Sequence, residues 1–207
     1  MSAERAWWAR VPLVLRRPRE VFAALRDESD EQAHARQEPV LAIVVLAGMA
    51  ALLSTARAGE LLDQPGRGDL VVAVWAFVGG MVYGAAVYFA LGVLVLLGMT
   101  LAGSLVRYRA ARHLLAYAAV PLALSLGLWP LRLLLFGRDS FRTGGSDATA
   151  AGTALDVLQS GFALWAVVLL ALGIRAYTGF GWGRSLAAAA IPAALPLALL
   201  ARGHGLV

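Results

Sequence analysis

The chain has 207 residues, of which 60% are hydrophobic and only 15% are charged, and its mean hydropathy is +0.71. Such values exclude an ordinary soluble domain and predict an all-α integral membrane protein. Because the sequence has no cysteine, it also excludes disulfides, thiolate catalysis and cysteine-ligated metals.

The charge balance is basic, and all 18 basic residues are arginine. A net charge of +5 can indicate nucleic-acid binding, but basic loops in a membrane protein set its orientation and contact anionic lipid headgroups. We therefore expect membrane lipid, and no nucleic acid, as a partner. The bias towards Arg, Ala, Gly and Leu is typical of a GC-rich genome, which indicates a bacterial inner membrane protein.

Residues 1–38 hold no apolar run long enough to cross a bilayer, so we expect a cytoplasmic segment that lies flat on the membrane. Trp7 and Trp8 stand among arginines, a pattern typical of amphipathic helices whose aromatic rings anchor in the headgroup layer. Pro18 suits the first turn of a short helix over 19–26. The acidic residues that follow this helix predict a solvated linker.

Five apolar segments come next, and none alternates as a barrel strand would, so only helices fit. Polar or basic loops separate them, and Pro121 and Pro130 interrupt the third. Together they predict a five-span membrane domain over 39–202, followed by an outer tail at 203–207. The expected transmembrane helices cover residues 39–55, 80–103, 114–136, 153–174 and 186–200.

The second of these segments lies in an uncharged run of 37 residues, 70–106. As one helix this run would be roughly 55 Å long, nearly twice the ~30 Å of a bilayer's hydrocarbon core. The glycine pair Gly79-Gly80 can permit a bend, so we expect a short interfacial or re-entrant helix over 70–79 before the span at 80–103. A single tilted helix is the alternative.

Arginine placement predicts the topology, because cytoplasmic loops carry the excess of basic residues. If the long run crosses once, 12 loop arginines lie on the side of the N-terminus and 5 on the other; if it crosses twice, the division is 10 and 7. The larger asymmetry favours five crossings of the cell membrane, with the N-terminus cytoplasmic and the C-terminus outside.

The second span carries a ridge of residues at every fourth position, Gly80, Gly84, Tyr88 and Gly92. Small residues at this spacing let a neighbouring helix approach closely. The ridge predicts either close packing within the molecule, which we favour, or a contact with a second copy or another membrane protein.

Arg132 and Asp156 are the charges set inside predicted spans, one near the end of a helix and one near the start of the next. In an antiparallel helix pair these two depths coincide, which predicts an intramembrane ion pair. Gln159 and Ser160 follow on the next turn. A charge in lipid is costly unless paired, so the pair indicates a structural link or, as the alternative, an ion or proton relay in a small permease.

No pattern in the chain indicates an enzyme. The sequence lacks a phosphate-binding glycine loop, paired catalytic carboxylates and a His-Glu-x-x-His motif. His113 lies at the start of a predicted span, where a lone histidine is more often an interfacial side chain than a metal ligand. We therefore expect no catalytic residues, no metal and no cofactor.

The segment 108–130, YRAARHLLAYAAVPLALSLGLWP, resembles the Yip (Ypt/Rab-interacting protein) domain family, in which a basic loop leads into a span with a Tyr and then a Pro. Tyr117 and Pro121 hold those places here. Pro18 and Phe22 match the Pro-x-x-x-Phe pattern common in bacterial members, and 164–184 resembles the family's glycine-rich turn before the last helix.

The resemblance implies five spans and a non-enzymatic role. Eukaryotic members of the family act in vesicle traffic and bind small GTPases, but their acidic and Tyr-Gly-Pro signatures are not evident in this sequence. We therefore do not take the resemblance to imply that this protein binds small GTPases. We expect a protein that organises membrane lipid or partner proteins, with a small permease as the alternative.

Overall fold

The computed structural model describes residues 3–27, 29–55, 57–64, 66 and 68–203, without the side chains of 195–203. Residues 204–207 of the expected tail lie outside this range. All regular structure in the described part is helical, as the sequence predicts. The elements are α1 (Ala3–Arg16), α2 (Pro18–Ala24), α3 (Asp30–Ala35), α4 (Gln37–Leu53), η1 (Ala58–Glu60), α5 (Asp69–Val74), η2 (Trp75–Gly79), α6 (Gly80–Leu101), α7 (Tyr108–Ala118), α8 (Val120–Ser125), α9 (Leu128–Phe136), η3 (Gly137–Phe141), α10 (Ala150–Thr178) and α11 (Trp182–Gly203).

Four helical segments of the described part are long and apolar enough to cross a bilayer: Asp30–Leu53, Asp69–Leu101, Tyr108–Phe141 and Ala150–Thr178. Large apolar side chains cover their outer faces, and Leu134, for example, is 84% exposed. An exposed apolar surface of this extent indicates contact with lipid. The fifth expected crossing falls on α11, whose later side chains are outside the described residues, so the count of five stays a prediction.

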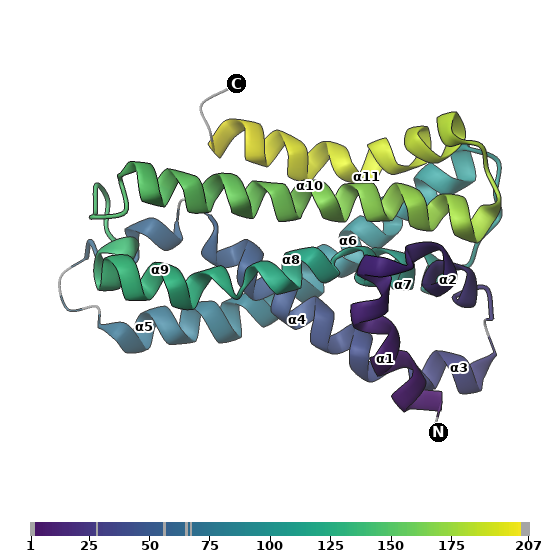
Figure 1. Ribbon diagram of the computed structural model, residues 1–207, viewed down its shortest axis with the longest axis horizontal. Helices are drawn as coiled ribbons and strands as arrows, with labels where there is room; N and C mark the ends of the chain where they lie inside the picture. The colour runs from purple at the N-terminus through teal and green to yellow at the C-terminus, as the bar shows by residue number, and fades with distance from the viewer. Residues whose placement is uncertain (1–2, 28, 56, 65, 67, 204–207) are drawn as a thin grey trace.

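The long helices run beside one another along the long axis of the molecule, and α1, α2 and α3 gather at one end (Figure 1). α4 packs against α6 and α8, while α6 also packs against α7 and α11. α10 lies against α11, α8, α7 and α2, so the N-terminal helices contact the bundle rather than standing apart from it.

The prediction of a break at Gly79-Gly80 is wrong, because the backbone is helical without interruption from Asp69 to Leu101. A π-helical turn, η2, joins α5 to α6 within this continuous helix. Both glycines keep ordinary right-handed helical angles there. The structure therefore adopts the continuous helix of the alternative weighed from the sequence, and its tilt in the membrane stays a prediction.

The glycines of this helix let two backbones touch. A Cβ atom added to Gly48 of α4 would lie only 2.3 Å from the Gly80 carbonyl oxygen, and one added to Gly84 would lie 2.5 Å from the Val44 carbonyl oxygen. Further along the ridge, a Cβ on Gly92 would lie 2.4 Å from the Arg112 side chain. The ridge thus packs against α4 and α7 of the same chain.

Proline divides the third long segment into three helices. Pro121 has no N–H to donate to Tyr117, and α7 ends just before it, with α8 beginning at Val120. A second break precedes Pro130, which then lies in the first turn of α9, where its missing donor costs nothing. Both interruptions expected from the sequence are therefore present.

Candidate functional site

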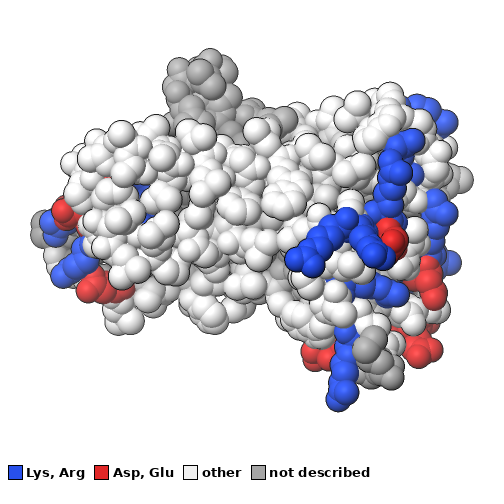
Figure 2. All heavy atoms as spheres, in the orientation of Figure 1, with Lys and Arg blue, Asp and Glu red and all other residues white. Residues whose placement is uncertain are grey.

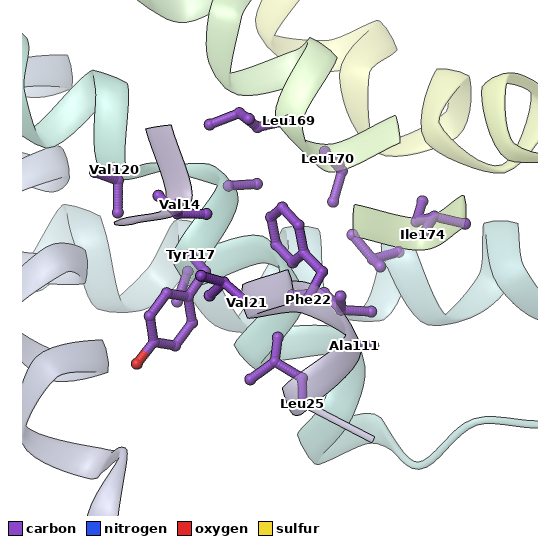
Figure 3. Packing of buried hydrophobic residues seen from close by; sticks show 14 of the residues in the cluster. Val14, Val21, Phe22, Leu25, Ala111, Tyr117, Val120, Leu169, Leu170 and Ile174 are labelled. Carbon is purple, nitrogen blue, oxygen red and sulfur yellow. The ribbon is translucent and has the colours of Figure 1, made fainter. Parts of the chain in front are cut away.

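The N-terminal helices are fixed to the bundle by a large aromatic contact. Trp7 of α1 is fully buried, its ring centroid lies 5.6 Å from that of Tyr117, and its Nε1 donates to the Gln32 side chain at 2.9 Å. Phe22 of α2 points among Leu169, Leu170 and Ile174 of α10 (Figure 3). These contacts make α1 and α2 part of the protein's main core.

The positions that carry the family resemblance lie in or beside this core. Pro18 begins α2, as the sequence predicts, and Phe22 on the same helix lies against Gly173, where a Cβ would be 2.9 Å from its ring. Tyr117 is fully buried at the end of α7, and Pro121 is buried in α8. The structure thus brings Phe22 and Tyr117 into one hydrophobic cluster, although they are far apart in sequence.

The assignment of both tryptophans as lipid anchors is wrong for Trp7, because its ring is buried inside the protein. Trp8, its neighbour, is 41% exposed, so its role as a lipid anchor stays a prediction. The linker expected after residue 26 also contains a short helix, α3, because the Ser29 side chain accepts from the Gln32 N–H. A Ser followed three residues later by Gln is a helix-start signal that predicts this helix.

Most of the described arginines gather at the end of the bundle where α1–α3 lie (Figure 2). They come from the N-terminal helices and the residues beside them, from the start of α7, from the last turn of α10 and from the first turn of α11. Several acidic residues lie among them (Figure 2). We call this set the basic end, in which Arg36 is buried and the other arginines are partly or fully exposed: Arg5, Arg10, Arg16, Arg17, Arg19, Arg26, Arg36, Arg107, Arg109, Arg112, Arg175 and Arg184.

Aromatic rings hold several of these guanidinium groups in place. The Arg10 guanidinium carbon lies 4.2 Å from the centre of the Trp7 ring, and that of Arg112 lies 4.7 Å from the Phe89 ring. At the other side of the basic end, Arg184 lies over Phe180 at 4.1 Å. Such cation–π contacts orient the side chains while leaving the charge able to attract anions.

The opposite end carries a three-residue ionic cluster around Arg132. Its Nη1 lies 2.7 Å from Asp156 Oδ1, and its Nη2 lies 2.9 Å from Asp147 Oδ2. Arg132 and Asp147 are mostly buried, whereas the Asp156 side chain is 46% exposed. The structure thus brings Arg132 and Asp156 together and adds a second carboxylate from the loop before α10, which the sequence interpretation missed.

The polar neighbours of this cluster are engaged in local hydrogen bonds. The Gln159 amide donates to the Ser125 hydroxyl at 2.8 Å, linking α10 to α8, and the Ser160 hydroxyl donates to the Asp156 carbonyl oxygen on its own helix. Two loops at this end are also joined by hydrogen bonds, which the Thr143 N–H and hydroxyl donate to the Asp63 carboxylate. These hydrogen bonds hold the pKa of the Asp63 carboxyl below its ordinary value. This end of the bundle is thus tied together by polar contacts.

A cavity of about 150 Å³ lies between the spans, lined by residues of α4, α6, α7, α8, α10 and α11. Its walls are small and apolar side chains, with Tyr83 and Tyr88 the polar exceptions. No cluster of metal-ligating side chains occurs in the part of the chain that the structure describes. The described residues therefore present a polar cluster at one end, a basic surface at the other and an apolar interior between them.

The architecture defines a multi-pass α-helical membrane protein. The family model described as the Yip1 domain matches residues 13–203, and the chain therefore belongs to the Yip1 domain family. The resemblance inferred from the sequence is thus confirmed. No curated protein and no solved structure matches the chain.

Proposed function

We propose that this protein is a non-enzymatic membrane protein that organises anionic lipid around its basic end. The observation that carries the proposal is the gathering of arginines around the docked N-terminal helices (Figure 2). Basic residues near a membrane surface attract anionic lipid by roughly 1 kcal/mol each. Because α1 and α2 are packed into the core, their arginines are held on a fixed surface rather than on a loose arm.

We also propose that the basic end lies at the cytoplasmic leaflet of the cell membrane. The positive-inside rule supports this orientation, because it places the side with more loop arginines in the cytoplasm. Lipid gathered at this surface would also favour contact with partner proteins that bind anionic membranes. A permease gains no comparable support, because the ionic cluster around Arg132 lies at one end of the bundle and the cavity between the spans has mainly apolar walls.

Energy transfer in reconstituted vesicles tests the proposal. The full chain is placed in phosphatidylcholine vesicles that contain a trace of dansyl-labelled phosphatidylglycerol or dansyl-labelled phosphatidylcholine. We expect transfer from the protein's tryptophans to be stronger to the anionic lipid, and the difference to shrink as salt screens the surface charges. Equal transfer to the two lipids at low salt would contradict the proposal.

A further inference from the structure

A hollow of about 330 Å³ lies at the basic end, between α2 and the last turns of α10. Arg19 and Ala23 of α2 form one side, and Arg175 and Leu172 of α10 form the other, with Phe180 of the following turn completing it. Two arginines from different helices thus line one hollow together with apolar side chains. That combination suits a ligand with an anionic head and an apolar body.

The C-terminal end of a helix normally repels anions, because its last carbonyl oxygens carry partial negative charge. Here Arg26 occupies that end of α10, since its Nε donates to the Tyr177 carbonyl oxygen at 2.8 Å and its Nη2 donates to the Ala176 carbonyl oxygen. A third arginine therefore satisfies the carbonyls, and Arg19 and Arg175 remain for a ligand.

The two lining arginines differ in how they are held. The Arg175 guanidinium lies over the Trp182 ring at 4.4 Å, a cation–π contact that orients it, while Arg19 is exposed on α2. Glu20, next to Arg19, pairs with Arg17 at 3.4 Å. Within the described ranges, no ion pair joins Arg19 or Arg175 to a carboxylate of the chain.

We propose that this hollow binds the phosphate of an anionic glycerophospholipid. Arg19 and Arg175 donate to the phosphate oxygens, and the glycerol and upper acyl chains lie along Leu172, about one turn deeper in α10. Guanidinium groups suit this ligand because they donate to phosphate oxygens in a planar, paired geometry. The inference rests on the proposed function and names the site through which one lipid is held.

Native mass spectrometry of the purified full chain in detergent tests the site. The protein is titrated with phosphatidylglycerol, with phosphatidylcholine and, in a competition arm, with inorganic phosphate. The variant Arg19→Gln/Arg175→Gln removes both guanidinium groups, and Arg57→Gln/Arg142→Gln is the matched control, with the same charge loss at exposed positions of the opposite end. Arg19→Gln alone, at an exposed position, is the substitute if the double variant does not fold.

We expect the hollow variant to bind the first phosphatidylglycerol about tenfold more weakly, as expected for the loss of charge-assisted hydrogen bonds, and the control to change by less than about twofold. Phosphatidylcholine should bind more weakly than phosphatidylglycerol to the unmodified protein. Equal losses in the two variants would overturn the site. Displacement of the lipid by an equal concentration of inorganic phosphate would also overturn it, because the site would then hold free phosphate.

The outcomes separate the site from the proposed function. If the vesicle experiment shows no preference for anionic lipid, the proposed function is wrong. If that preference is present but the hollow variant behaves as its control does, only the specific site is wrong.

Discussion

Replacing Trp7 with Ala will lower the free energy of unfolding by about 3–5 kcal/mol, the range found when a fully buried large aromatic side chain is truncated. The Trp7 ring has no exposed surface and packs against Tyr117, and the change also removes the hydrogen bond to Gln32. Reversible unfolding in mixed micelles, followed by circular dichroism, measures the loss.

Trp8→Ala is the matched control, because the same side chain is removed one residue away at a position that is 41% exposed. We expect it to cost less than about 1 kcal/mol, as is usual for surface substitutions. If Trp7 acted as a lipid anchor instead, both variants would unfold almost as the unmodified protein does. Equal and small losses would therefore contradict the packing of α1 on the bundle.

Replacing Arg132 with Met should lower the free energy of unfolding by about 2 kcal/mol. Removing one partner of a fully buried ion pair costs roughly 3–5 kcal/mol, and we expect less here because the Asp156 side chain is 46% exposed. The loss arises because Asp147 and Asp156 would be left close together without the guanidinium between them. The same unfolding assay measures it.

Arg57→Met is the control at the same end of the molecule, because Arg57 forms an exposed pair with Glu60 at 3.3 Å. Such surface pairs contribute about 0–1 kcal/mol, so the change should be small. Combining Arg132→Met with Asp147→Asn should cost less than the sum of the single changes, because each removes the partner of the other. Strictly additive losses would show that the two side chains do not interact in the folded protein.

The sequence predicts the helical segments well where composition alone decides them. Long apolar runs without charges can only form helices in a bilayer, so the four described candidate spans follow directly from the pattern. Pro18, Pro121 and Pro130 also lie at helix starts or breaks for a local reason, since proline lacks the N–H that a helix interior needs.

Partners distant in sequence were harder to predict. The depths of Arg132 and Asp156 in their helices indicated that they meet, but no pattern indicated that the loop would bring Asp147 to the same guanidinium. Trp7 next to arginines has the composition of a membrane anchor, and only the tertiary fold decides that its ring faces Tyr117. Likewise, Gly79-Gly80 favours a bend locally, but contact with Gly48 of α4 explains a glycine there without one.

Cysteine labelling measures most directly whether the basic end faces the cytoplasm. The chain has no cysteine, so single replacements give an unambiguous signal. Ser29→Cys marks the start of α3 at the basic end, and Ser146→Cys marks the loop before α10 at the opposite end. With a membrane-impermeant maleimide on intact cells, we expect labelling at 146 and, only after permeabilisation, at 29. Labelling of intact cells at 29 but not at 146 would contradict the account.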